Sequence, residues 1–243
     1  IPNGPSAEIF QPESKTHVLR EPLLNHPFAG FALAEVPLEG HLMCGGGTWN
    51  NTDASMVPKT PCGLLTDKLK LLPWAELPIG TAFHAMVRLQ DGQNSILLTG
   101  GINETASQTK KGDASAKAWI LRNPDSSSNW EAVGDLVIPR AAHRVVATPD
   151  GGAIVFGGAD GMGPGYARDF TSIYCPERYD PFTESFVLVE PCVTAGAGPH
   201  PVYAHHPDHE MVLLGNRMLT SGGADIAVLP INGPQNLEWD LVQ

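Results

Sequence analysis

Pairs of glycine residues recur in this chain at a nearly regular interval, each soon after a short apolar segment. The pairs are Gly46–Gly47, Gly100–Gly101, Gly157–Gly158 and Gly222–Gly223. The interval between them is just over fifty residues for the first two steps and somewhat longer for the last. A unit of this length cannot bury both faces of its own sheet, so the period predicts an array of similar units that stack on one another.

A second series of residues keeps the same spacing. Trp74, Trp130 and Phe186 follow the first glycine of their pairs at almost equal distances along the chain, and Trp239 follows its own pair sooner. Asp-Gly dipeptides precede the second and third apolar segments and predict tight hairpin turns there. Each repeat therefore predicts a small antiparallel sheet, with two strands before a variable loop and two after it. An array of such sheets is typical of a β-propeller.

The third repeat resembles the kelch repeat over Arg140–His143 and Ala153–Gly158. The resemblance covers most of the chain and is weakest in the first repeat, where no Asp-Gly turn precedes Gly40. Kelch-type repeats also build the central domain of the galactose oxidase and glyoxal oxidase family. The resemblance thus implies an all-β, kelch-like β-propeller of four-stranded antiparallel blades, and it leaves both a binding module and an oxidase open.

The glycine pairs divide the single predicted domain, 1–243, into four blades. Their expected ranges are 26–78, 79–136, 137–192 and 197–243. The N-terminal segment 1–25 is similar to the closing hairpin of a fifth blade whose partner strands are missing from the sequence. Since kelch-type propellers usually have six or seven blades, we expect an incomplete part of a larger propeller, with other parts of that propeller or assembly among its partners. The alternative is a self-contained small propeller in which the hairpin pairs elsewhere.

Charge and hydropathy exclude two classes of partner. The formal net charge is −11, with only 15 Lys and Arg residues, and such a surface repels phosphate backbones. Nucleic acid is therefore not an expected partner. No apolar run approaches the roughly eighteen residues of a membrane helix, so no membrane span is predicted.

The four cysteines form two local pairs. Cys44 and Cys62 lie in the first repeat, and Cys175 and Cys192 lie in the third, at almost the same separation along the chain. The matched spacing predicts two disulfides, each worth about 3 kcal/mol, and an oxidising compartment. The alternative is that Cys44 and Cys175 are buried strand thiols and that their even number is accidental.

Two glycosylation sequons begin at Asn50 and Asn103. Each asparagine follows a glycine pair within a few positions, so both are expected at the start of the same exposed loop in successive blades. Together with the cysteines, they favour an extracellular or cell-surface glycoprotein. A cytoplasmic kelch adaptor is the alternative.

The segment 200–210 concentrates side chains that can bind metals. They are His200, His205, His206, Asp208, His209 and Glu210, with Tyr203 among them. Of these, His205, His206 and His209 are candidate copper or zinc ligands. Tyr203 with a neighbouring histidine is similar to the Tyr-His copper pair of galactose-oxidase-like enzymes. However, that family joins a tyrosine to a cysteine near the first repeat, and Phe28–Ala32 contains no cysteine.

Three histidines recur at one repeat position, which favours a structural role. His84, His143 and His206 precede the first glycine of their pairs at almost equal distances along the chain. A recurrent residue is expected to hydrogen-bond between blades or to line the central channel. We therefore predict no cofactor, with copper as the alternative.

The segments after the glycine pairs favour recognition through loops. The predicted face loops are long and polar, over 48–62, 102–116 and 159–170. Recognition on such scaffolds is usually carried by loops, so the sequence favours a non-catalytic module that binds a glycan or a protein. The predicted contact residues are Tyr166, Arg168, Tyr203, His205 and His206. The alternative function is a copper radical oxidase relative.

Overall fold

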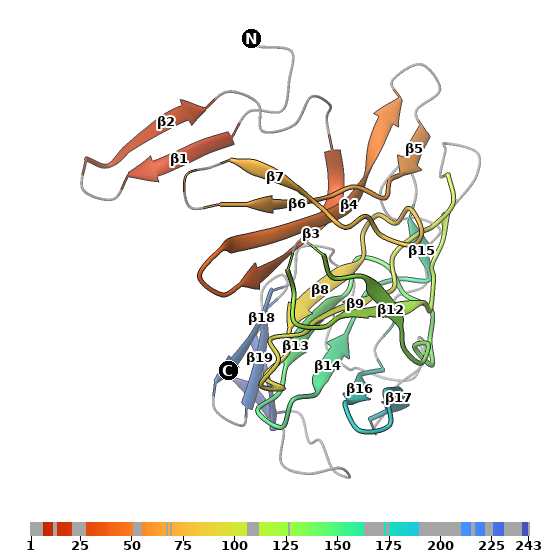
Figure 1. The fold of residues 1–243 in the computed structure, drawn as a ribbon. Helices are drawn as coiled ribbons and strands as arrows, with labels where there is room; N and C mark the ends of the chain where they lie inside the picture. The colour runs from red at the N-terminus through yellow and green to blue at the C-terminus, as the bar shows by residue number, and fades with distance from the viewer. Residues whose placement is uncertain are drawn as a thin grey trace.

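The computed structural model describes residues 7–11, 14–20, 28–50, 55–66, 68, 70–105, 112–125, 127–162, 173, 175–189, 210–214, 217–221, 226–230 and 240–242. Over these ranges the chain is all-β and contains no helix. Most of the strands form four antiparallel sheets that follow one another along the chain (Figure 1). The predicted fold class is confirmed. No helix in this described part is long and apolar enough to cross a membrane.

The four sheets are the blades, numbered in chain order. Blade one contains β3 (Phe28–Val36), β4 (Gly40–Asn50), β6 (Cys62–Leu65) and β7 (Leu71–Trp74), with β5 (Ser55–Pro58) paired to the end of β4. Blade two contains β8 (Ala85–Arg88), β9 (Ile96–Thr99), β11 (Ala118–Leu121) and β12 (Trp130–Ala132). Blade three contains β13 (Arg144–Ala147), β14 (Ala153–Phe156), β16 (Glu177–Asp180) and β17 (Ser185–Leu188). Blade four contains β18 (Glu210–Leu214), β19 (Arg217–Ser221), β20 (Ile226–Pro230) and β21 (Asp240–Val242).

The first strands of the four blades lie side by side in chain order. β3 contacts β8, β8 contacts β13 and β13 contacts β18. Within each blade the following strands pair outward in sequence, as in the order β8-β9-β11-β12 of blade two. This succession of inner strands is the arrangement that places propeller blades around a common axis.

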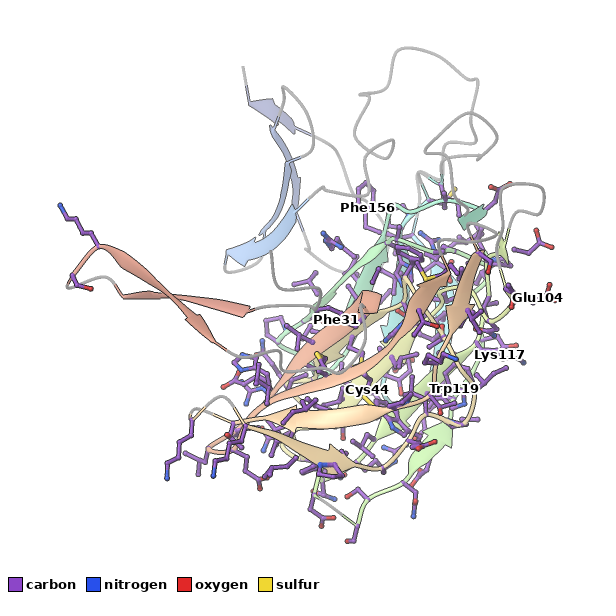
Figure 2. All side chains as sticks on the ribbon, turned by 90° about the horizontal axis from the view of Figure 1, so that it is seen from above. Phe31, Cys44, Glu104, Lys117, Trp119 and Phe156 are labelled. Carbon is purple, nitrogen blue, oxygen red and sulfur yellow. A yellow bond between two sulfur atoms is a disulfide. The ribbon has the colours of Figure 1, made fainter. Side chains whose placement is uncertain are left out.

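A separate hairpin precedes blade one. β1 (Ala7–Gln11) and β2 (Thr16–Arg20) pair antiparallel, with Ile9 opposite Val18, and form a sheet of their own. The hairpin projects away from the four blades in Figures 1 and 2.

Two successive glycines take left-handed backbone conformations at the same position of blades one, two and three, within β4 in blade one and directly after β9 and β14 in blades two and three. Their φ angles are 61° and 86° in Gly45–Gly46, 61° and 96° in Gly100–Gly101, and 72° and 90° in Gly157–Gly158. The structural pair of blade one is therefore Gly45–Gly46, and the prediction of Gly46–Gly47 was wrong. Gly47 continues β4 and pairs with Pro58. Gly45, Gly46 and Gly47 are consecutive, so the sequence alone did not show which two of them form the left-handed pair.

The first glycine of the pair contacts the next blade too closely to carry a side chain. A Cβ on Gly100 would lie 2.3 Å from the carbonyl oxygen of Arg140 and 2.6 Å from Cε1 of His143. The N–H of Gly101 donates to the same Arg140 carbonyl at 2.9 Å. Blades two and three are thus joined by backbone contact and by a histidine ring that packs on bare glycine backbone.

The same contact joins blades one and two. A Cβ on Gly45 would lie 2.5 Å from the carbonyl oxygen of Thr81 and 2.6 Å from Cε1 of His84. The N–H of Gly46 donates to the Thr81 carbonyl at 2.8 Å. Only glycine combines this space with the left-handed conformation at low cost, which explains why the sequence repeats glycine here.

Apolar side chains fill the spaces between the blades. Cys44 and Trp74 of blade one share a cluster with Met86 and Trp119 of blade two, and Figure 2 shows Cys44 and Trp119 close together. A second cluster between blades two and three contains Leu97, Ile120, Val155, Tyr179 and Phe186. Blade two therefore buries both of its faces, as a stacked repeat must.

The aromatic residues of the fourth strands are placed partly as predicted. Trp74 and Phe186 are buried between sheets, with 9% and 6% of their surface exposed, which confirms the prediction for these two. Trp130 is half-buried against the cluster between blades one and two. Trp239 lies outside the described residues.

Trp74 is not the structural equivalent of the other aromatic residues. Trp130 and Phe186 face the preceding blade, whereas Trp74 packs in the cluster shared with the following blade. The equivalent of Trp130 in blade one is Leu71, because it pairs with Leu65 as Trp130 pairs with Leu121. The inferred register of the series was therefore wrong in blade one.

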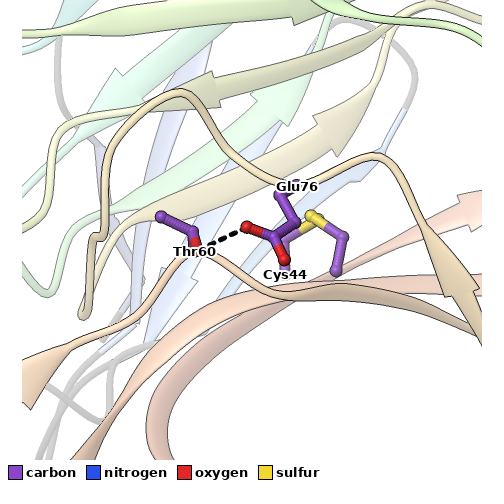
Figure 3. The surroundings of a disulfide bond; sticks show 4 residues. Cys44, Thr60 and Glu76 are labelled. Atoms are coloured by element: carbon purple, nitrogen blue, oxygen red, sulfur yellow. Dashed lines mark hydrogen bonds between the residues drawn. A yellow bond between two sulfur atoms is a disulfide. The ribbon is translucent and has the colours of Figure 1, made fainter.

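One disulfide links neighbouring strands of blade one (Figure 3). Cys44 on β4 is directly opposite Cys62 on β6, with 4.1 Å between their Cα atoms. Nearby, the Thr60 hydroxyl donates to Oε2 of Glu76 at 2.8 Å (Figure 3). Cys175 is also disulfide-bonded, and its predicted partner, Cys192, lies outside the described residues.

Replacing Phe186 by alanine should lower the free energy of unfolding by about 3–5 kcal/mol, because the ring fills a layer between two blades. The ring also stacks at a tilt on Tyr179, with 5.1 Å between their centroids. The matched control is Phe182→Ala, since 92% of Phe182 is exposed. Urea unfolding measures both variants. Equal losses in the two variants would contradict burial of Phe186 between blades.

Candidate functional site

The contact and metal-binding residues predicted from the sequence lie outside the described residues. They are Tyr166, Arg168, His200, Tyr203, His205, His206, Asp208 and His209. Glu210 is the first residue of β18. Their roles remain predictions. Among the residues that the structure does describe, no group of three or more His, Cys, Asp or Glu side chains could hold a metal ion.

The segment after the first glycine pair is largely a hairpin and not the predicted loop 48–62. β4 runs on to Asn50, and β5 folds back on it with Ser55 opposite Asn50 and Pro58 opposite Gly47. Met56 of β5 is buried at 5% exposure. This part of the predicted binding face is therefore held by strand pairing.

The segments after the second and third glycine pairs bind each other. β10 (Gly112–Asp113) pairs antiparallel with β15 (Gly161–Met162). The N–H of Ala114 also donates to the carbonyl of Asp160 at 3.0 Å. Ile102 bridges both Ala82 and Ala114. Two segments that the sequence presents as separate loops thus form one surface across blades two and three.

An apolar layer supports this surface from below. It consists of buried Met56, Ala82, Ile102 and Ala141, with Phe83, Ala114 and Ala142 packed against them. These residues come from all of blades one, two and three, so their packing fixes the three segments relative to one another. We call the surface built on this layer, from 48–50, 55–62, 102–105, 112–116 and 159–162, the loop face.

The sequon residue Asn103 lies at the edge of the loop face. Its Nδ2 donates to Oγ of Ser115 at 3.1 Å, and the side chain is half-buried. Attachment of a glycan replaces one of the two hydrogens of Nδ2, and glycosylation of Asn103 remains a prediction. Asn50 is the last residue of β4, and its glycosylation likewise remains a prediction.

A buried ion pair anchors blade three beneath the loop face. Arg140 and Glu177 are fully buried, with 2.6 Å between Nη2 and Oε1. Arg140 also donates to the carbonyls of Gly157 and Cys175, and Glu177 accepts the backbone N–H groups of residues 137 and 138. Burial lowers the pKa of Arg140, and the charge of Glu177 opposes that shift. Because both charges are paired and hydrogen-bonded, the pair has a structural role. Glu177 belongs to no motif or repeat, so sequence reasoning did not predict its role.

The recurrent histidines described by the structure join the blades. His143 of blade three is buried, and its Nε2 lies 2.8 Å from Oγ1 of Thr99 in blade two. His84 is buried between blades one and two, against Gly45. Burial lowers the pKa of His84 to about 3, although the backbone of Cys44 favours the protonated ring. The expectation of hydrogen bonding between blades is confirmed for His143.

A cavity of about 290 Å³ opens on the opposite face of the molecule, between the hairpin turns of blades two and three. Leu89 and Ile120 form part of its lining, with Arg122, Tyr179 and Phe182 beside them. Burial raises the pKa of Tyr179 to about 12. Arg122 forms ion pairs with Glu131 and Glu184, which do not line the cavity.

The succession of sheets, the glycine contacts and the loop face define a protein of the β-propeller class. No protein-family model matches the chain, and no curated protein matches it. Among solved structures, the chain is similar to YjhT, a kelch-type β-propeller, with a TM-score of 0.60 and 16% sequence identity. The match covers 91% of this chain and 67% of that chain. At this identity the likeness shows the fold.

Acidification should destabilise the protein partly through His84. The unfolded state binds a proton near pH 6.5, whereas the folded state resists it until about pH 3, so the free energy of unfolding falls as the pH falls between these values. The His84 contribution has a slope of up to about 1.4 kcal/mol per pH unit. His84→Gln should flatten the dependence between pH 6.5 and 4.5, measured by urea unfolding. The exposed His41 supplies the control, His41→Gln, which should keep the wild-type slope. An unchanged slope in His84→Gln would contradict the effect of burial.

Proposed function

We propose that this chain is a non-catalytic β-propeller module that recognises a glycan or a protein through the loop face. The observation that carries the proposal is the pairing of β10 with β15, which turns segments of two blades into one surface. The predicted contact residues Tyr166 and Arg168 follow β15 closely in the sequence. In the proposed function, Tyr166 and Arg168 contact the ligand together with this surface.

The packing beneath the loop face favours binding because it reduces the cost of ordering. Association requires loops and side chains at an interface to lose conformational freedom. Here the strand pairs β4–β5 and β10–β15, and the buried side chains of Met56 and Ile102, hold the segments before a ligand arrives. Rigid strands that carry variable segments are the usual basis of recognition by loops.

Charge and disulfides limit the proposed partners and their compartment. With a net charge of −11, the protein suits a neutral or cationic ligand better than a phosphate-rich one. The Cys44–Cys62 disulfide and the disulfide-bonded Cys175 support an extracellular or cell-surface setting, because structural disulfides persist in oxidising compartments. Glycosylation at Asn50 and Asn103 belongs to the same proposal.

A glycan array and an affinity capture with extracellular proteins should identify a ligand of the loop face. Ala114→Pro should then weaken its binding at least tenfold, because the backbone N–H of Ala114 donates to the Asp160 carbonyl next to the β10–β15 pair and proline removes this donor. Ala114→Ser keeps the N–H and is the matched control, so it should retain binding. Both variants should remain folded by circular dichroism, since β10 and β15 form a two-stranded sheet of their own outside the four blades.

Mass spectrometry and metal analysis of the secreted protein test the rest of the proposal. We expect glycans at Asn50 and Asn103 and binding without copper. Peroxide production on galactose or glyoxal after copper loading would contradict the non-catalytic proposal and favour the copper radical oxidase relative. Ligand binding that Ala114→Pro leaves intact would contradict the loop face as the binding surface.

A further inference from the structure

Blade one exposes an apolar face that has no partner sheet among the described residues. Alternate residues of β3 point away from the core, and of these Phe31 is 40% and Leu33 45% exposed. Met43 lies opposite Leu33 on the same face and is half-buried, as is Leu71. We call these four residues, Phe31, Leu33, Met43 and Leu71, the open face.

The equivalent face of blade two is covered by blade one. Gly30 and Phe83 are the left-handed residues near the start of the first strands of blades one and two. Leu33 and Met86 each lie three residues after them and therefore correspond to each other. Met43, which pairs with Leu33, corresponds to Leu98, which pairs with Met86. Met86 is only 8% exposed and Leu98 is fully buried, both in the cluster shared with blade one. The open face thus has the composition of an interface between blades, and an exposed apolar sheet face of this kind indicates a binding surface.

A backbone hydrogen bond repeats between the inner strands and specifies the geometry of the missing partner. Gly30, Phe83 and Ala142 occupy the same position in successive blades, with left-handed φ angles of 69°, 57° and 55°. The N–H of Phe83 donates to the carbonyl of Gly30, and the N–H of Ala142 donates to the carbonyl of Phe83, each at 2.7 Å. By the same rule, the N–H of Gly30 is directed to the carbonyl of an inner strand that precedes β3.

Phe31 indicates what the second strand of that partner contains. Phe31 occupies the position of His84 and His143, whose rings pack on Gly45 and Gly100 of the preceding blade. An aromatic ring at this position therefore requires a glycine without a side chain opposite it. The partner of the open face should accordingly have a second strand that ends in Gly-Gly.

The hairpin β1–β2 has the chain spacing of the outer half of such a blade. The connection between blades one and two runs from the end of β7 to Ala85, and that between blades two and three runs from the end of β12 to Arg144. The connection from the end of β2 to Ala32, which is the equivalent position of β3, has almost the same length as these two. β1 and β2 therefore correspond to the third and fourth strands of a blade before blade one.

We propose that the open face and the edge of β1 opposite β2 together bind one further β-hairpin of the same repeat type. This hairpin supplies an inner strand, which hydrogen-bonds to Gly30, and a second strand, which pairs with β1 and ends in Gly-Gly beneath Phe31. It completes a four-stranded blade with β1–β2 and covers Phe31 and Leu33. The surface is separate from the loop face, so the inference does not depend on the proposed function.

A synthetic peptide with the sequence of residues 139–159 is a suitable probe. In the chain this segment forms the inner hairpin of blade three, with β13, β14 and the Gly157–Gly158 pair. We expect saturable binding of the labelled peptide to the whole chain by fluorescence anisotropy, together with slower amide hydrogen exchange in residues 7–11. Leu33→Asp should weaken this binding at least tenfold. Leu38→Asp is the matched control, because Leu38 is a fully exposed leucine in the β3–β4 turn, and it should leave binding unchanged.

A change in the peptide tests the glycine contact itself. A peptide with Gly157→Val should lose binding, because its added side chain would occupy the space that the Phe31 ring needs. Absence of saturable peptide binding, or binding that Leu33→Asp does not affect, would overturn the proposal. A dimer of the chain that Leu33→Asp dissociates, without peptide binding, would also overturn it, since a second copy would then be the occupant.

Discussion

The structure depends on one close contact, repeated between blades. A ring that precedes the first strand of a blade packs on the bare backbone of a left-handed glycine in the blade before it, as His84 does on Gly45 and His143 on Gly100. The following glycine donates its N–H to the next blade at the same place. These contacts set how closely the inner strands approach, and the apolar clusters between the blades follow from that approach.

The two faces of the molecule follow from the same contact. The segments that follow the glycine pairs lie on one side of the molecule, where β4 pairs with β5 and where β10 and β15 pair across blades two and three. The turns between strands, including Asp91–Gly92 and Asp150–Gly151, lie on the other side around the cavity. The proposed recognition on the loop face and the proposed completion of the propeller at the open face therefore use separate surfaces of one repeated geometry.

Several features of this fold were readable from the sequence because they repeat. The period of the glycine pairs and the Asp-Gly turns predicted four-stranded antiparallel sheets, and the recurrence of His84 and His143 predicted a structural role. Local ambiguity caused the errors. Three successive glycines concealed the register of blade one, and Trp74 matched the spacing of Trp130 while facing the opposite way.

The features that sequence reasoning missed depend on contacts between distant segments. The pairing of Gly112–Asp113 with Gly161–Met162 joins loops that differ in length and composition, so no repeated sequence pattern predicted it. Glu177 binds Arg140 from a distant part of the sequence and belongs to no repeated motif. The candidate contact residues at 166–168 and 203–209 lie outside the described residues, and their roles are still predictions from the sequence.

The most direct test of this account compares two glycines by equilibrium unfolding. Gly92 is left-handed with φ of 77° but has open space around it, so Gly92→Ala should cost only the backbone strain, about 1–2 kcal/mol. Gly100 is left-handed with φ of 61° and lies against blade three, so Gly100→Ala should cost more than about 4 kcal/mol or prevent folding while Gly92→Ala still folds. Equal losses in the two variants would contradict the claim that the glycine contact holds the blades together.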